Sequence, residues 1–309
     1  MSSVVNVILP IFGLILIGYL CRRTGRLGET AASELNRFVV WLCLPALLFR
    51  ATATATWAEI WHPQFLAVVA IGTLTVFIAT LAYRLRGSRH LADASIDGLG
   101  AAYANTGYVG IPLSLLVLGE AGLEPALIAT LFVACVLFAI AVICIEVGLQ
   151  AERSPSHAVL KVAKALARNP LVVSPLLGAL WALSGQDLPH ALDAFLRLLG
   201  DATTPCALVS LGLFLAQKQS GSTQGTLGLV GLKLFVHPLI TWVLAYQVFS
   251  LPPLWAQSAL LMSALPTGTG PFMLAEFYRR EAAVVSRTVL LSTLGSLVTL
   301  SLCLYLIQG

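Results

Sequence analysis

The sequence predicts an all-α protein that crosses a lipid bilayer many times. Apolar residues make up 58% of the 309 residues and charged residues only 10%, whereas a soluble domain carries about 25% charged residues. The mean hydropathy is +0.89, so the chain lacks the polar surface that a water-facing globule needs. The apolar residues gather in long runs, and a run of about 20 residues is enough for one transmembrane helix.

Ten such runs are expected to form transmembrane helices. The first is not expected to be a cleavable signal peptide, because no basic residue precedes it and Arg22 and Arg23 follow it. The sixth run is short and the seventh carries charged residues, which sets these two apart. The ten predicted spans are residues 4–21, 35–55, 64–84, 97–118, 123–149, 170–186, 191–216, 226–249, 254–277 and 285–307.

The loops predict the orientation in the membrane. Lysine and arginine follow spans one, three, five, seven and nine, and the other four loops contain neither residue. Because positive charge collects on the cytoplasmic side, we expect a multi-pass protein of the plasma (inner) membrane with both termini extracytoplasmic. The net charge of +4 is thus a topology signal, and no basic stripe interleaved with aromatic residues indicates nucleic-acid binding.

Motifs of the first half recur in the second half at an offset of roughly 160 residues. Since a unit of five spans is odd, the second half enters from the opposite face, and this inverted repeat places a binding site between the halves. The predicted organisation is a first repeat at 1–150, a cytoplasmic linker at 151–168 and a second repeat at 169–309. The matching motifs are Pro10-x-x-Gly13 with Pro175-x-x-Gly178, Arg37 and Pro45-Ala46-Leu47-Leu48 with Arg197 and Pro205-Cys206-Ala207-Leu208, and Gly110-Ile111-Pro112 with Gly270-Pro271.

Spans four and nine are interrupted by glycine and proline near mid-depth. Pro112 and Pro271 suit the first turn of a restarted helix, so residues 105–111 and 266–270 are expected to be non-helical. Such backbone is tolerated in a membrane only inside the protein or along a watery cavity. Two half-helix N-termini at one place favour an anion, and the two C-terminal ends expose carbonyls that could hold a cation. The alternative is a pair of proline kinks that stabilise a helical bundle.

Residues 105–112, Asn-Thr-Gly-Tyr-Val-Gly-Ile-Pro, resemble the span-four signature of the auxin efflux carrier family. Pro266-Thr267, with Phe272, Leu274-Ala275 and Phe277-Tyr278 after it, resembles that family's span-nine signature. The resemblance covers nearly the whole chain and also includes Asn169-Pro170, Gly231-x-Lys233 with Pro238, and Ser292-Thr293-Leu294.

This resemblance implies ten helices in a 5+5 inverted repeat, with broken helices 4 and 9 crossing at the site. It implies a scaffold of helices 1, 2, 6 and 7, a moving core of helices 3–5 and 8–10, and a fold similar to that of bile-acid sodium symporters. It also implies small organic anions as cargo, namely auxin in plants and dicarboxylates such as malate or malonate in bacteria.

The candidate substrate-binding residues come from the two interrupted spans. The family often has a second asparagine at the position of Gly270, so only half of an asparagine pair is present here. Backbone amides in its place and a different substrate both remain open. The candidates are Asn105, Thr106, Gly107, Tyr108, Gly110, Pro112, Pro266, Thr267, Gly268, Thr269, Gly270 and Pro271.

Three charged residues within the spans are further candidates, because an ionisable group in a membrane is costly. Asp201 is open to three roles: an ion pair with Arg197, a coupling proton, or a charge facing the site. Lys233 and Arg50 are expected to extend to the membrane surfaces, with a turn toward the site as the alternative. His237 is expected to be a packed, neutral histidine.

These observations predict a secondary transporter that moves a small organic anion by alternating access, in an elevator-like manner. A proton- or sodium-coupled symporter of a neutral or bulkier solute and a channel are the alternatives. No G-x-S-x-G, no H-E-x-x-H and no paired intramembrane aspartates are present, so no enzyme is expected. No metal and no cofactor are expected beyond a coupling proton or sodium ion. The expected partners are the organic anion and the lipid bilayer, and a homodimer is open.

Overall fold

The computed structural model describes residues 2–55, 61–150, 164, 167–216 and 224–308, and these are almost entirely helical. Their one extended pairing is an isolated antiparallel bridge between Ala104 and Thr267. The helices are α1 (Ser2–Arg23), α2 (Ala31–Phe38), α3 (Leu44–Ala53), α5 (Pro63–Arg86), α6 (Leu91–Ala102), α7 (Ile111–Leu118), α8 (Leu123–Leu131), α9 (Phe138–Leu149), α11 (Pro170–Leu183), α12 (His190–Asp201), α13 (Thr203–Leu215), α14 (Thr226–Gly231), α15 (His237–Trp242), α16 (Pro253–Ala264), α17 (Gly270–Phe277) and α18 (Ala283–Gln308).

Several of these helices are consecutive parts of longer ones. Wider π-helical turns join α2 to α3 at Val39–Cys43, α8 to α9 at Phe132–Leu137 and α14 to α15 at Leu232–Val236. Among the described residues, six helical stretches are long and apolar enough to cross a membrane, so a multi-pass all-α protein is confirmed. They are Ala31–Ala53, Pro63–Arg86, Glu120–Leu149, His190–Leu215, Thr226–Val248 and Ala283–Tyr305.

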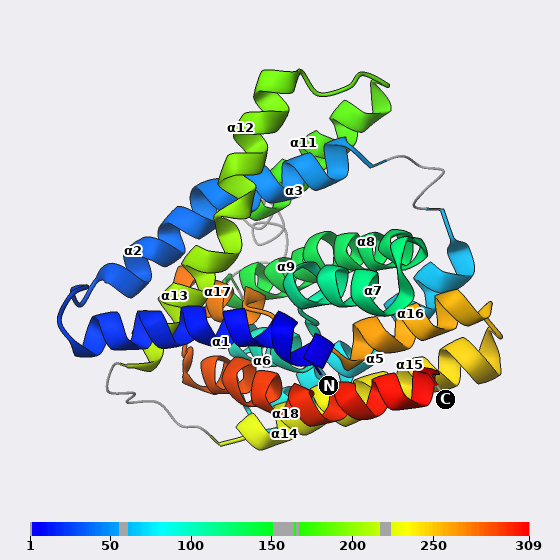
Figure 1. The fold of residues 1–309 in the computed structure, drawn as a ribbon. Coiled ribbons are helices and arrows are strands. Elements are labelled where there is room, and N and C mark those ends of the chain that lie inside the picture. The colour runs from blue at the N-terminus through cyan, green and yellow to red at the C-terminus, as the bar shows by residue number, and fades with distance from the viewer. Residues whose placement is uncertain (1, 56–60, 151–163, 165–166, 217–223, 309) are drawn as a thin grey trace.

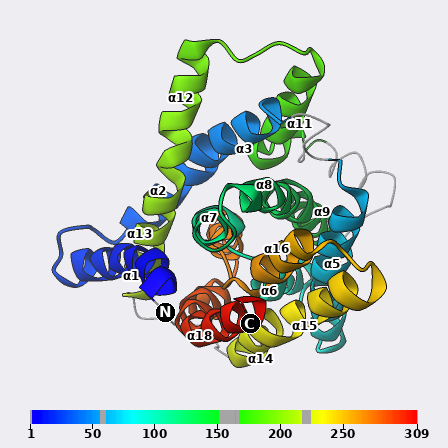
Figure 2. The same cartoon turned by 45° about the vertical axis from the view of Figure 1, so that its right-hand side comes forward.

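The helices form two groups (Figures 1 and 2). In Figure 2, α1, α2, α3, α11, α12 and α13 lie to the left and above, and the other helices form a bundle to the lower right. Glycines allow close contacts within the first group. A Cβ atom on Gly212 of α13 would overlap the carbonyl oxygen of Ile15 in α1, and one on Gly178 of α11 would overlap that of Phe49 in α3. Gly178 therefore has a packing role, whereas a Cβ atom on Gly13, its counterpart in the repeated motif, would meet nothing within 4 Å.

Both predicted interruptions are present, but their boundaries differ from those expected. The chain leaves helical geometry at residues 103–105 and 265–269. The expectation of a non-helical 105–111 was wrong for 106–111, because Thr106–Gly110 forms a π-helical turn that continues into α7. The expectation of a non-helical 266–270 was wrong at Gly270, because this residue begins α17. The Asn105 carbonyl accepts hydrogen bonds from the N–H groups of Val109 and Gly110, each 3.1 Å long, so the glycines here do not prevent helical winding. Pro112 and Pro271 do lie in the first turns of α7 and α17.

The predicted linker at 151–168 lies outside the described residues, except for Lys164, Ala167 and Arg168. The first described helix after it begins at Pro170, where the side chain of Asn169 accepts a 3.0 Å hydrogen bond from the Leu171 N–H. The division into two repeats therefore stays a prediction.

Candidate functional site

The two interrupted spans meet at their breaks. The Asn105 N–H donates to the Pro266 carbonyl, and the Gly268 N–H donates to the Tyr103 carbonyl, both at 2.9 Å. These bonds make the antiparallel bridge between Ala104 and Thr267. Each break thus supplies partners for backbone groups that the other leaves exposed, as the interior of a membrane requires. We call this meeting point, residues 103–106 and 265–270, the crossing.

Thr267 holds the crossing in place. Its hydroxyl donates a 2.8 Å hydrogen bond to the Gly100 carbonyl in the last turn of α6. Its own N–H donates to the Ser292 hydroxyl of α18 at 3.0 Å. Because both groups are engaged with the protein, Thr267 contributes to the shape of the crossing, and its hydroxyl is not available to a ligand without breaking a bond.

Three other predicted site residues keep their side-chain polar groups unengaged. The side chains of Asn105, Thr106 and Thr269 are buried, yet none of them hydrogen-bonds to another described residue. Their polar atoms are not among the described side-chain atoms that are both completely buried and without a partner, so a ligand can reach them. These three side chains are therefore the strongest binding candidates at the crossing.

The half-helix that follows the break at 103–105 begins earlier than expected. The Ile111 N–H is bonded to the Thr106 carbonyl, so this amide is occupied, and the N-terminal end of the half-helix lies at Thr106. The second half-helix begins at Gly270, and the Thr269 carbonyl accepts a 3.0 Å bond from the Met273 N–H. Thr106 and Thr269 therefore flank the two positive helix ends.

Tyr103 is a residue of the crossing that the sequence did not single out. A Cβ atom on Gly268 would lie 2.9 Å from Tyr103 Cε1, and one on Gly270 would lie 2.9 Å from Tyr103 Cζ. The ring also packs on Phe138, with a centroid separation of 5.8 Å. The aromatic ring thus fills the space that a side chain at 270 would need. An aromatic residue two positions before Asn105 was the available signal.

We predict that Gly270→Asn destabilises the protein through this contact. Overpacking costs roughly 1–3 kcal/mol, and we expect most of that cost to disappear when Tyr103→Ala is combined with it. Melting temperatures of both single variants and the double variant give the coupling free energy. Gly228→Asn is the matched control, because a Cβ atom there meets nothing within 4 Å. Additive effects of Gly270→Asn and Tyr103→Ala would contradict the contact.

The remaining candidates from the two interrupted spans contribute packing space or backbone groups. Gly110 allows close packing, since a Cβ atom there would lie 2.8 Å from Leu265 Cδ1. Gly107 faces a more open space, where a Cβ atom would meet only Thr130 Cγ2 at 3.7 Å. Pro266 supplies the carbonyl of the bridge. The side chains of Tyr108 and Pro112 lie outside the described part of the structure.

Each of the three charged candidates has partners of its own. Asp201 ends α12 with 73% of its side chain exposed, and its oxygen is 3.9 Å from the Arg197 guanidinium. Arg50 joins α3 to α12 through Asp193, with an Nε–Oδ1 distance of 2.6 Å. The expectation that Lys233 extends to the membrane surface was wrong: its side chain is fully buried, because α15 and α16 pack around it and supply its partners.

A large cavity lies between α2 and the end of α17, on the side predicted to be cytoplasmic. Its volume is about 570 Å³. Three of its residues are arginines and one is a glutamate; Arg37 is paired with Glu34 and Arg280 with Asp93, whereas Arg279 has no ion-pair partner among the described residues. Within it, the Asn36 amide donates a 3.2 Å hydrogen bond to the Met273 carbonyl of α17, which links α2 to the helix that starts at the crossing. The cavity is lined by Ser33, Asn36, Arg37, Trp41, Glu276, Phe277, Arg279 and Arg280.

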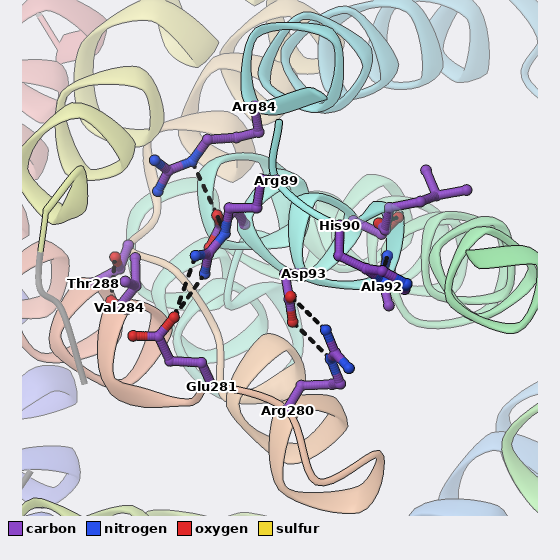
Figure 3. A network of polar contacts seen from close by, with 12 residues as sticks. Arg84, Arg89, His90, Ala92, Asp93, Arg280, Glu281, Val284 and Thr288 are labelled. Carbon is purple, nitrogen blue, oxygen red and sulfur yellow. Dashed lines mark hydrogen bonds and ion pairs between the residues drawn. The ribbon is translucent and has the colours of Figure 1, made fainter. Parts of the chain in front are cut away.

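A network of ion pairs joins the turn after α17 to the start of α6 (Figure 3). Asp97 is buried between Arg84 and Arg89, with N–O distances of 2.9 and 2.8 Å. Both contacts are ion pairs. They are not hydrogen bonds, because neither Arg89 Nε nor Asp97 Oδ2 has a partner in hydrogen-bonding geometry. Arg89 also contacts Glu281 at 3.2 Å.

The second pair of this network is Arg280 with Asp93. The Arg280 Nε lies 2.7 Å from the Asp93 Oδ1, and a second nitrogen contacts Oδ2. These hydrogen bonds raise the pKa of Arg280 above its ordinary value, so its charge is fixed. Since Asp93 and Asp97 belong to α6, the helix before the first break, and Arg280 and Glu281 follow α17, the network holds the two interrupted spans together away from the crossing.

The helices, their breaks and the crossing define a multi-pass membrane protein with an internal polar site, which is the architecture of a carrier. Comparison with known families agrees, since the model of the family described as "Membrane transport protein" matches residues 3–304. The chain belongs to this family, which includes the auxin efflux carriers. It is therefore a membrane transporter and not an enzyme.

Individual relatives extend this result. The chain is 31% identical to the "Putative malonate transporter" of Rhizobium meliloti over 100% of its own length and 97% of that protein. It is 25% identical to the "Uncharacterized transporter YfdV" of Escherichia coli K12 over 96% of each chain. It is 32% identical to "Auxin efflux carrier component 8" of Arabidopsis thaliana over 45% of this chain and 40% of that one.

Proposed function

We propose that this protein is a secondary transporter that moves a small organic anion across the plasma membrane by alternating access. The observation that carries the proposal is the set of buried and unengaged side chains of Asn105, Thr106 and Thr269 at the crossing. Two half-helix N-termini lie beside them, and residues 103–106 and 265–270 contain no carboxylate. Hydrogen-bond donors and positive helix ends together suit a carboxylate.

The substrate class that we propose is a dicarboxylate, with malonate as the first compound to test. The printed name of the Rhizobium relative, which matches the full chain, supports this choice. The arginine-lined cavity supports it as well, because Arg279, which has no ion-pair partner among the described residues, would attract an anion to the cytoplasmic mouth of the protein. In this proposal the anion passes from that cavity to the crossing when the Asn36–Met273 contact opens.

The architecture that we propose is ten transmembrane helices in a 5+5 inverted repeat, with both termini extracytoplasmic. Helices 1, 2, 6 and 7 form the scaffold, and the other six form a core that moves like an elevator. The packing of α1 on α13 and of α3 on α11 and α12 supports the scaffold. The Asn36 bond to Met273 would be one of the contacts that break as the core moves.

Counterflow in proteoliposomes tests this function. We expect vesicles preloaded with unlabelled malonate to accumulate labelled malonate transiently, with an uptake rate that saturates. A channel would instead show flux that rises in proportion to concentration and no counterflow. Counterflow of a neutral solute in place of malonate would favour the alternative of a symporter for neutral or bulkier compounds. Absence of malonate counterflow would contradict the proposed substrate.

A further inference from the structure

A fully buried lysine lies beside the crossing. Lys233 has no exposed side-chain surface, and its Nζ donates a 2.6 Å hydrogen bond to the carbonyl of Ser263. Ser263 lies in the last turn of α16, the half-helix that ends at the crossing. Since the C-terminal end of a helix carries negative potential, a positive charge is favoured there. The ammonium group of Lys233 thus supplies the positive charge that the C-terminal carbonyl groups of α16 attract.

The second partner of Lys233 is a histidine one helical turn away. Lys233 Nζ lies 3.1 Å from His237 Nδ1, and His237 Nε2 lies 3.3 Å from the Thr73 hydroxyl of α5. When the ammonium donates to Nδ1, the imidazole is neutral and carries its hydrogen on Nε2. If His237 were also protonated, two donors would face each other in a buried place, so the pair holds at most one excess proton.

No described carboxylate lies within ion-pair distance of either residue. The elements packed around the pair are α5, α6, α14, α16, α18 and the turn Val243–Val248. Helices α14 and α16 carry no ionisable side chain. Asp97 of α6 contacts Arg84 of α5, and Asp93 contacts Arg280. The other ionisable groups on these elements are Tyr83, Arg86, Tyr246, Arg287, Cys303 and Tyr305.

An uncompensated buried charge is costly. The charged state of the pair is therefore favoured when an anion is bound nearby and disfavoured when no anion is bound. A small cavity of about 10 Å³ lies between His237 and the crossing: it is lined by Thr73, His237 and Ser263 as well as by Ala104 and Thr106. That volume is close to the space needed by a single water molecule. The protonated pair and an anion at the crossing would therefore attract each other across a short distance inside the protein, where the dielectric constant is low.

We propose that Lys233 and His237 form a proton-binding site that couples anion transport to proton movement. Loading places one proton on Nζ. For release, Nζ passes a proton to His237 Nδ1 while Nε2 gives up its own proton, past Thr73, to water in the cavity, so that both side chains end neutral. The positive form strengthens anion binding and the neutral form weakens it, which by reciprocity makes the anion retain the proton. The inference rests on the proposed function and names its coupling ion.

Proton-driven uptake of labelled malonate into proteoliposomes tests this site. With the membrane potential clamped at zero and one proton moved per anion, a gradient of one pH unit should give about tenfold accumulation by the wild type. His237→Gln keeps an acceptor for Lys233 and a donor for Thr73 but does not relay protons. We expect this variant to retain counterflow within about twofold at equal pH and to lose proton-driven accumulation. Lys233→Met should lose that accumulation too.

The matched control is His62→Gln, because His62 pairs with Glu124 at a partly exposed position and should keep the full response. If Lys233→Met does not fold, His237→Gln decides the question. Two results would overturn the coupling site and leave the proposed function intact. One is proton-driven accumulation that persists in His237→Gln; the other is wild-type malonate counterflow without any accumulation in response to the pH gradient. Absence of wild-type malonate counterflow would contradict the proposed function instead.

Discussion

Asn105→Ala should abolish or strongly reduce transport while the protein still folds. The Asn105 side chain is buried and has no partner among the described residues, whereas its backbone groups make the bonds of the crossing. Alanine keeps those backbone bonds and removes only the amide. A hydrogen bond to a charged group contributes about 1.5–3 kcal/mol, so the affinity for the anion should fall about 10- to 100-fold.

The measurement is malonate counterflow together with the melting temperature of the purified variant. Gln186→Ala is the control, since it removes an amide from an exposed loop and should change neither quantity. Wild-type transport by Asn105→Ala would remove Asn105 from the site. A large fall in melting temperature would show instead that the amide supports the fold.

Asp97→Ala should cause the largest loss of stability among single charge removals. Asp97 is buried with Arg84 and Arg89 on either side of its carboxylate. Without it, two guanidinium groups face each other, and among the residues that the structure describes only Arg89 keeps an acidic partner, Glu281. Removing one partner of a buried ion pair costs about 3–5 kcal/mol.

Thermal unfolding in detergent measures this loss, with Asp187→Ala as the control because Asp187 is exposed. We expect the control to unfold within a degree or two of the wild type and Asp97→Ala to unfold well below it. Equal melting temperatures for the two variants would show that the network in Figure 3 does not hold the interrupted spans together.

Local composition was enough to predict the interrupted spans. Glycine and proline near mid-span indicated the breaks, and the structure has both. The exact boundary at Asn105 was not predictable, because the π-helical turn at Thr106–Gly110 depends on how the Asn105 carbonyl is shared between two N–H groups. Sequence periodicity does not distinguish such a turn from an unwound segment.

Partners distant in sequence account for the rest of what was missed. Lys233 lies near the end of its apolar run, which favoured extension to the membrane surface, but its actual partner is a carbonyl 30 residues away in α16. Likewise, Arg50 pairs with Asp193 at a separation of 143 residues, and Tyr103 packs against Gly268 and Gly270. Each of these contacts depends on tertiary packing, which no local pattern of residues indicates.

The central claim is that the crossing binds a small organic anion, and its most direct test is a thermal-shift titration with malonate and malonamide. The two compounds have nearly the same shape, but malonamide is neutral. At 100 times its dissociation constant a ligand stabilises the folded protein by about 2.7 kcal/mol. We predict that malonate raises the melting temperature of the wild type, that malonamide does not, and that Asn105→Ala removes the effect of malonate. Stabilisation by malonamide as large as that by malonate would contradict an anion site at the crossing.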